Sequence, residues 1–268
     1  MGEKPKNSLV YFAIAQARHN TVLRLGSYAA DIQDRMRKAG YPDFQKTVSM
    51  AFDLMPQIGE EKHTQNQPRV EQVERLIFLS SDYSKGFIVE QNALSFQTTK
   101  YDTFETFADE FAKGLGIIHE CVTLAHSERV GLRYLGAIVP SNGEAGLGDY
   151  LVPGVLGLGE NLPDSVEVSH SLTETQILTA ECVVLARTII QAGPLGFPMD
   201  LQPMGTKIAE RFQSIDGVHA IIDADASSEG RHSFDVDAIK AQLKKLRNGV
   251  ALAFDALVTP VARDEWKI

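Results

Sequence analysis

An arginine pair separated by a glycine is the first group in the sequence whose chemistry suits binding. Arg129, Gly131 and Arg133 alternate with apolar residues. Successive side chains of a β-strand point to opposite faces, so the two guanidinium groups are expected on one face of a strand. Guanidinium forks bind carboxylates and phosphates, and a glycine between them lets a ligand approach the backbone. We therefore interpret Arg129 and Arg133 as ligand-binding residues, and the alternative is that both pair with acidic residues of the fold.

A histidine and two aspartates form a second such group near the end of the chain. His219, Asp223 and Asp225 share one alternating stretch with apolar residues between them. Carboxylates bind hard cations and imidazole binds transition metals, so the spacing predicts a metal site of these three residues. Two other interpretations stay open: a solvated strand face, and pairing of the two carboxylates with Arg129 and Arg133.

Nothing in the sequence indicates nucleophilic catalysis or a cofactor. There is no Gly-x-Ser-x-Gly motif, and Ser169, His170 and Ser171 are only neighbours in the chain. The two cysteines, Cys121 and Cys182, form no Cys-x-x-Cys motif and are interpreted as buried free thiols. We assign no catalytic residue and expect no cofactor.

The composition is that of a globular protein with an acidic balance. Hydrophobic residues make up 44% of the 268 residues, charged residues make up 23%, and the formal net charge is −9. Nucleic-acid-binding proteins usually carry a basic excess or stripe, so we expect no nucleic-acid partner and interpret the lysines at 240–245 as a solvated helix face. The apolar run at 9–17 is shorter than the ~20 residues of a membrane helix. We expect a cytoplasmic protein without a membrane segment.

Apolar periodicity predicts strands and two helices in the first half. Strands are expected at 9–18, 69–80, 86–91, 94–99 and 129–139, and a helix is expected at 28–39. A longer helix is expected to start at Asp102, with Glu105 completing a capping box. Its apolar stripe must face a core, and it consists of Phe104, Phe107, Phe111, Leu115, Ile118 and Val122.

The second half is predicted to repeat this pairing of strands with one long helix. The stretch at 166–191 is β-rich with a turn at Ala180-Glu181, prolines indicate a loop at 193–205, and a strand is expected at 217–226. The last helix is expected to begin at Asp235 or Asp237 and to end at Pro260. Its apolar residues repeat at heptad spacing, and they are Ile239, Leu243, Leu246, Val250, Ala253 and Leu257.

These elements predict the fold class and the organisation of the chain. Strands in runs joined by short turns are typical of an α+β fold with mostly antiparallel sheets, each packed by a long amphipathic helix. We expect an N-terminal α+β half at 1–140, a glycine-rich connection at 141–163, and a C-terminal α+β half at 164–268 that ends in the long helix.

Three segments resemble a sporadically distributed, functionally uncharacterised bacterial family. The family has an Arg-x-Gly-Leu-Arg-Tyr strand, matched here at 129–134, after an aromatic helix entry and before an Ile-Asp-x-Asp strand, matched at 222–225. Members often have Asn two residues after the tyrosine, where this chain has Gly136. The resemblance spans nearly the whole chain and implies kinship, without an activity to carry over.

The residues favour a non-enzymatic binding or scaffold protein of unknown ligand. We expect a protein partner or a second copy to bind through the C-terminal helix, because its apolar stripe is long. The alternative is a metal-dependent hydrolase or nuclease that uses the Asp-x-Asp strand of Asp223 and Asp225.

Overall fold

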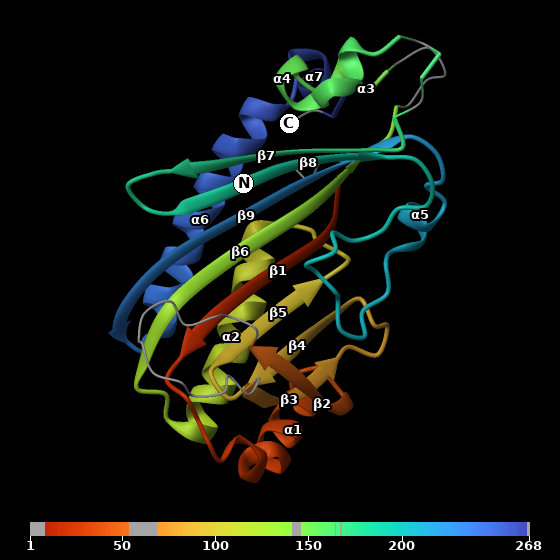
Figure 1. Ribbon diagram of the computed structural model, residues 1–268. Coiled ribbons are helices and arrows are strands. Elements are labelled where there is room, and N and C mark those ends of the chain that lie inside the picture. The colour runs from red at the N-terminus through yellow and green to blue at the C-terminus, as the bar shows by residue number, and fades with distance from the viewer. Residues whose placement is uncertain (1–8, 54–68, 141–145, 164, 167, 267–268) are drawn as a thin grey trace, which may run out of the picture.

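The computed structural model describes residues 9–53, 69–140, 146–163, 165–166 and 168–266, and its centre is one antiparallel sheet (Figure 1). The strands are β1 (Val10–His19), β2 (Asp43–Asp53), β3 (Arg69–Leu79), β4 (Lys85–Glu90), β5 (Ala93–Thr98), β6 (His126–Ile138), β7 (His170–Leu178), β8 (Val183–Gln191) and β9 (His219–Ser233). They form a nine-stranded sheet in the order β2-β3-β4-β5-β1-β6-β9-β8-β7. The strands expected from periodicity are confirmed, and β9 continues seven residues past the expected end at Ala226.

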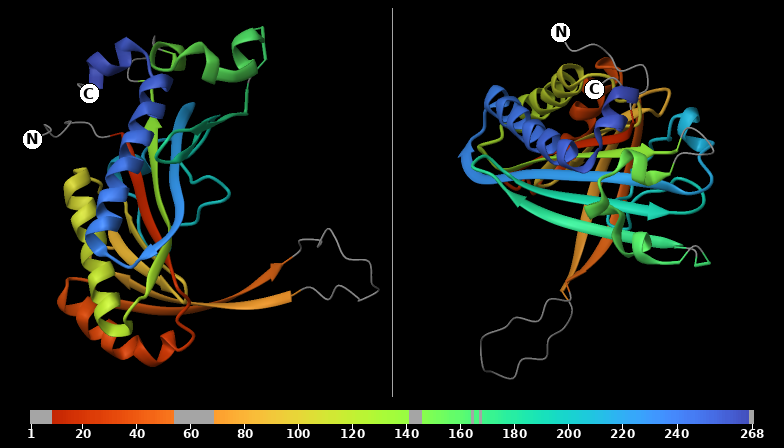
Figure 2. Two further views of the ribbon diagram at one scale, coloured as in Figure 1. Left: turned by 90° about the vertical axis from the view of Figure 1, so that its left-hand side faces the viewer. Right: turned by 90° about the horizontal axis from the view of Figure 1, so that it is seen from above.

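Two long helices lie on one face of this sheet. They are α2 (Phe104–Val122) and α6 (Val236–Leu257), and α1 (Ala29–Lys38) packs beside α2 (Figure 2). The shorter elements are the 3₁₀-helices η1 (Leu25–Tyr28) and η2 (Gly157–Asn161), and the helices α3 (Leu147–Tyr150), α4 (Pro153–Leu156), α5 (Glu210–Gln213) and α7 (Pro260–Trp266). The connection expected at 141–163 therefore contains short helices, and its residues 141–145 lie outside the described part of the chain.

The two halves of the chain are built on the same plan, although their sequences show no repeat. Read outward from the central β1–β6 pair, one half has the order β1, β5, β4, β3, β2 and the other has β6, β9, β8, β7. Each half ends in a long helix on the same face, α2 after β5 and α6 after β9. The helices run antiparallel, because Lys240 pairs with Asp109 while Arg247 lies over the Phe104 ring.

The aromatic stripe of α2 is buried against the first half of the sheet, as expected. Its core residues from Phe104 to Ile118 are buried, and the Phe107 ring packs 5.2 Å from the Phe96 ring of β5. The helix start differs from the expected one. The N-cap is Thr103, whose hydroxyl accepts a hydrogen bond of 3.2 Å from the Thr106 N–H, so the expected capping box of Asp102 and Glu105 is wrong.

The apolar stripe of α6 packs against other residues of the same chain. All six stripe residues are buried on the sheet, so they are not free to bind a partner. Asp235 caps the helix by accepting a 2.8 Å hydrogen bond from the Ala238 N–H, which confirms one of the two expected starts. The helix ends at Leu257, and Pro260 begins α7 because proline suits a first helical turn.

The segment between β8 and β9 covers part of the opposite sheet face. Tyr11 donates a 2.8 Å hydrogen bond to the Gly196 carbonyl, and Gln97 donates one of 2.6 Å to the Met204 carbonyl. Phe197 and Phe212 pack on Tyr11 of β1 at centroid distances of 5.5 and 5.9 Å. The loop expected at 193–205 is therefore confirmed, and it is a packed cover for the sheet.

The antiparallel α+β fold is confirmed, with one correction: one sheet replaces the several that were expected. A single sheet results because the expected halves share strand pairing. Strand β6, within 1–140, pairs with β9, within 164–268, from His126–Ser233 to Ile138–Ala220. The main core likewise contains residues of both halves. Among the described residues, no helix is long and apolar enough to cross a membrane.

Candidate functional site

The two arginines of β6 lie on the sheet face opposite the long helices, and one of them is paired. Arg133 holds Asp223 of β9 with both ends of its guanidinium group, through Nε–Oδ1 and Nη2–Oδ2 distances of 2.7 Å. Both side chains are buried, with residue exposures of 7% for Arg133 and 1% for Asp223. This pairing is the alternative to ligand binding that the sequence left open, and for Arg133 it holds.

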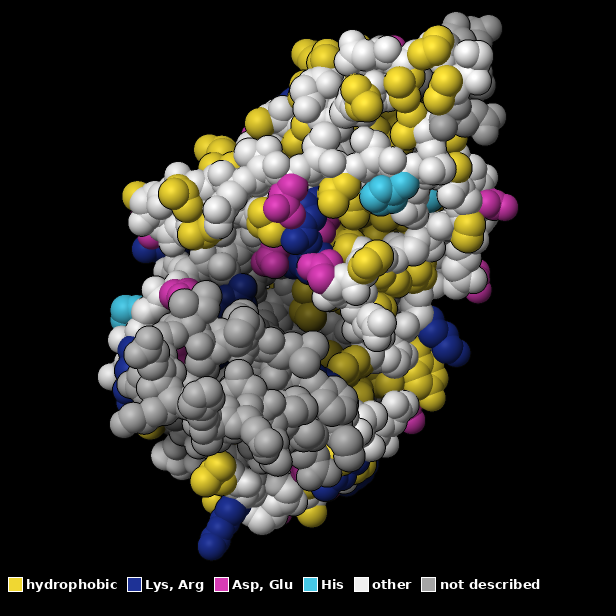
Figure 3. Space-filling model, in the orientation of Figure 1, with side chains coloured by type: hydrophobic (Ala, Val, Ile, Leu, Met, Phe, Trp, Pro, Cys, Tyr) yellow, Lys and Arg dark blue, Asp and Glu magenta, His cyan; other side chains and the backbone are white. Residues whose placement is uncertain are grey.

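The Arg133–Asp223 pair belongs to a row of alternating charges across four strands. Arg187 of β8 lies 3.4 Å from Asp223 and 2.7 Å from Glu174 of β7. Asp200, from the segment that covers this face, lies 3.0 Å from both Arg133 and Arg187. Figure 3 shows acidic and basic side chains gathered on this face beside a hollow. We call Arg133, Arg187, Glu174, Asp200 and Asp223 the charged row.

Within the charged row, ion pairing favours the ionised forms of Arg133, Arg187 and Asp200. Burial acts to lower the pKa of Arg133, but its hydrogen bonds to Asp223 and Asp200 raise that pKa overall. The hydrogen bonds from Arg133 lower the pKa of Asp200 to about 2. A guanidinium group held by two carboxylates has little capacity left for an anionic ligand. The row therefore ties four strands and the covering segment together.

Arg129 and Asp225 lie beside this row without joining it. The Arg129 guanidinium folds over Gly131, where an added Cβ would lie 2.9 Å from Nη1, and it donates only a long 3.4 Å hydrogen bond to Gln16. Asp225 stands directly across the strand pair from Arg133, but it makes no hydrogen bond or ion pair within the described residues. Burial raises the pKa of the Asp225 carboxyl. Asp225 is therefore a half-buried acid whose burial outweighs the favourable charges of Arg133 and Arg129 nearby.

The three residues expected to bind a metal do not come together as a site. His219 is buried at the start of β9, where Nδ1 lies 2.9 Å from the Gly217 carbonyl and Nε2 lies 3.2 Å from Gln191. Asp223 is occupied by the arginines of the charged row. Within the described parts of the chain, no group of three or more His, Cys, Asp or Glu residues can hold a metal ion.

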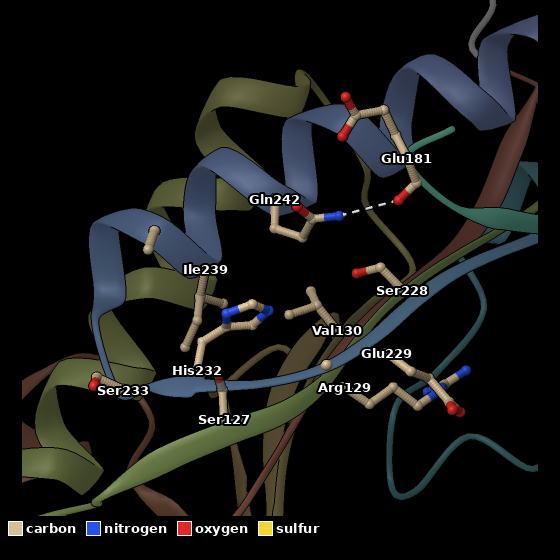
Figure 4. A pocket seen from close by; sticks show the side chains of 12 residues that line it. Ser127, Arg129, Val130, Glu181, Ser228, Glu229, His232, Ser233, Ile239 and Gln242 are labelled. Carbon is tan, nitrogen blue, oxygen red and sulfur yellow. Dashed lines mark hydrogen bonds between the residues drawn. The ribbon is translucent and has the colours of Figure 1, made fainter. Parts of the chain in front are cut away.

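A polar pocket of about 350 Å³ lies under the first turns of α6. Figure 4 shows the side chains of His232, Ile239 and Val130 pointing toward one another there, while Arg129 and Glu229 extend away from them. Gln242 donates a long 3.4 Å hydrogen bond to the Glu181 carbonyl at its rim. The exposed His232 ring lies close to Gly230 and has no described hydrogen-bond partner. These groups are dispersed, and they present no convergent set for one ligand.

A second pocket of about 350 Å³ lies on the helix face, between the start of α2 and the second half of α6. Its floor is formed by the sheet residues Gly136, Ile222 and Ala224, and α6 supplies apolar and aromatic side chains to one wall. We call this the α2–α6 pocket. Its lining residues are Leu9, Val10, Tyr101, Asp102, Tyr134, Gly136, Ile222, Ala224, Arg247, Val250, Ala251, Phe254, Asp255, Arg263 and Trp266.

Small floor residues keep the α2–α6 pocket open. A Cβ added at Gly136 would meet no atom closer than 3.8 Å, so the glycine leaves space that a larger side chain would fill. The polar groups of the lining are few. The Tyr101 and Tyr134 hydroxyls lie 3.1 Å apart, and Arg247 lies near them with its guanidinium 5.5 Å from the Phe104 ring centre. Burial raises the pKa of both tyrosines, so both hydroxyls carry their protons at neutral pH.

Sequence reasoning identified the β6 arginines but missed most of their surroundings. Asp200 lies in an irregular segment, and nothing in its neighbours indicates that it reaches Arg133, 67 residues away in the chain. Arg187 and Glu174 occur in the predicted β-rich stretch, where alternation gives their faces but not their partners. Tyr134 enters the sequence analysis only as the last residue of the motif at 129–134, and nothing in the sequence indicates that Tyr101 or Arg247 lies near it.

Comparisons with known proteins add no family to these observations. No family model matches the chain, and no curated protein matches it. The resemblance to a bacterial family at 129–134 and 222–225 stays a prediction.

Proposed function

We propose that the protein is a non-enzymatic binding protein and that its ligand is a small molecule held in the α2–α6 pocket. One observation carries this proposal: a pocket of about 350 Å³ has a mostly apolar lining with a few polar groups in it. Ligand sites in proteins typically have this character, with volumes of roughly 300–1,000 Å³ and a small number of polar groups that orient the ligand.

The chemistry of the lining supports binding and suggests no reaction. The polar groups are two tyrosines, two arginines and two aspartates, and the described lining residues include no histidine, cysteine or serine. A general base needs a pKa near neutrality, and the pKa values of both tyrosines are raised by burial. We therefore propose a ligand site on the helix face of the sheet, in place of the expected site at Arg129 and Arg133 on the other face.

The chain contains its own reporter for this site. Trp266 is the only tryptophan in the sequence, and it lines the α2–α6 pocket while stacking on Tyr150 at 5.6 Å. We expect titration with octanol, a small amphipathic probe, to change the Trp266 emission in a saturable manner. We expect Gly136→Leu to abolish the change, because its side chain fills the pocket.

Gly116→Leu is the matched control, because it adds the same side chain where a Cβ meets nothing within 4 Å and outside the lining of the α2–α6 pocket. Ala251→Phe is a second blocking variant at the exposed rim, which protects the test if Gly136→Leu fails to fold. Saturable binding that is lost in a folded blocking variant and kept in Gly116→Leu supports the proposal. An emission change of equal size in all four proteins contradicts it.

A metal-dependent hydrolase built on His219, Asp223 and Asp225 is the other candidate from the sequence. No observation of the described residues favours it, since Asp223 is held by Arg133 and Arg187. We therefore propose no second function.

A further inference from the structure

We infer that the ligand of the α2–α6 pocket is an amphipathic acid, with an apolar body over Gly136 and an anionic head at Arg247 and the Tyr101–Tyr134 hydroxyl pair. This inference rests on the proposed function and deepens it. It assigns a ligand class from the exposed Arg247 and the Tyr101–Tyr134 hydroxyl pair, which have hydrogen-bonding capacity that the described residues do not use.

Among the described lining residues of the pocket, Arg247 is the charged one that has no ion-pair partner. It makes no hydrogen bond or ion pair with the described residues, and its described contact is with the face of the Phe104 ring. The other charged lining residues are engaged. Arg263 holds Asp255 at 2.9 Å and also donates to its carbonyl, and Asp102 has an interaction of its own. An incoming anion therefore has one guanidinium group to pair with.

The tyrosine pair adds a donor beside this cation. The two hydroxyls share one hydrogen bond of 3.1 Å, which uses the proton of only one of them. The other proton has no described acceptor, so it can be donated to a ligand. Arg247 lowers the pKa of both tyrosines by its charge, although burial has the larger and opposite effect. The charge of Arg247 therefore reaches the two hydroxyls, beside which we place the head group of the ligand.

The body of the ligand is set by the remaining lining. Val250, Phe254 and Ile222 present apolar surface, and Gly136 and Ala224 present backbone with little side chain. Apolar surface favours a hydrocarbon or aromatic body at roughly 25 cal/mol for each Å² buried. Burying a charged head there without a partner is costly, so the head must lie at the Arg247 end.

Three probes of one chain length test the head group. Octanoate, octanol and octylamine are titrated against the full chain, with Trp266 emission as the readout. We expect octanoate to bind most tightly and octylamine most weakly. We expect Arg247→Gln to weaken octanoate binding about tenfold and to leave octanol binding unchanged, because only octanoate pairs with the guanidinium group. Lys244→Gln is the control, since it removes one positive charge from α6 outside the pocket.

The outcomes separate this inference from the function on which it rests. Equal binding of octanoate and octanol, both unaffected by Arg247→Gln but both abolished by Gly136→Leu, overturns the acidic ligand and keeps the pocket as the site. Preferential binding of octylamine also overturns it. A tenfold loss in Lys244→Gln as well means that the effect comes from net charge, and the assignment to Arg247 fails. Binding of all probes that survives Gly136→Leu and Ala251→Phe removes the site itself.

Discussion

Asp223 and Asp225 are two residues apart on the same face of β9, but their surroundings are opposite. Asp223 is almost fully buried and accepts hydrogen bonds from two ends of the Arg133 guanidinium group. Asp225 is half-buried and makes no described hydrogen bond. A buried charge is stable only when it is paired, so the two aspartates are expected to contribute to stability with opposite sign.

Replacing each aspartate by asparagine tests this contrast. Asp223→Asn leaves Arg133 as a buried cation short of a partner, and we expect it to lower the free energy of unfolding by roughly 3 kcal/mol. Asp225→Asn removes a carboxylate that burial disfavours, and we expect it to raise the free energy of unfolding at neutral pH. Urea unfolding at pH 7 measures both. Two changes of the same sign would show that this account of the face is wrong.

The pH dependence of the Asp225 variant follows from the direction of its shift. Burial raises the pKa of Asp225 in the folded chain above its ordinary value of 3.8. The folded state then holds this proton more tightly than the unfolded state does, so stability falls as pH rises from 3.8 through the raised value. The advantage of Asp225→Asn should therefore be full above the raised pKa and should vanish below pH 3.8.

At the scale of elements, α2 owes its position to a close approach to the sheet. Gly114 faces the Phe87 ring of β4, and a Cβ at that position would overlap the ring. Gly116, one position past Leu115 in the same helix, has nothing within 4 Å of an added Cβ. Both glycines weaken the helix intrinsically, but only Gly114 is required by the packing.

We expect alanine at these two positions to have opposite effects. Gly116→Ala should raise the free energy of unfolding by up to about 1 kcal/mol, because alanine has the higher helix propensity and meets no clash. Gly114→Ala should lower it by roughly 1–3 kcal/mol, because the helix must move away from Phe87. Thermal unfolding of the two variants beside the parent chain measures the difference. Stabilisation by Gly114→Ala would mean that α2 does not lie this close to β4.

At the scale of the whole molecule, the shared sheet predicts that the chain unfolds as one unit. Phe107 lies in the first half, and Trp266 lies at the end of the second. We expect Phe107→Ala to lower the free energy of unfolding by about 3–5 kcal/mol, since the side chain is buried. Because β6 pairs with β9, the unfolding midpoint reported by Trp266 should shift by the same amount as the midpoint from far-ultraviolet circular dichroism.

The exposed Glu105 of α2 supplies the control, because Glu105→Ala changes the same helix without opening the core. A Trp266 midpoint that stays in place while the circular dichroism shifts would show that the halves at 1–140 and 164–268 unfold separately. That result would mean that the two parts behave as separate domains in unfolding, although they share one sheet.

The sequence by itself determined the elements, because their signals are local. Strand alternation at 9–18 and 129–139 and the helical stripes from Phe104 and from Ile239 depend on residues only a few positions apart. The common face of Arg129 and Arg133 follows from the same alternation. The start of α2 could not be fixed in the same way, because Asp102 and Thr103 are both residue types that suit an N-cap. Only the hydrogen bond from the Thr106 N–H to Thr103 distinguishes them.

Only the tertiary structure decided which faces meet. Alternation states that Arg133 and Asp223 are on polar faces, but the register between β6 and β9 makes them partners, and Asp200 reaches them from an irregular segment. The α2–α6 pocket likewise joins Tyr134, Arg247 and Trp266 from three elements. Pairing of distant strands and helices depends on the packing of the whole core, which leaves no periodic trace in the residues that it brings together.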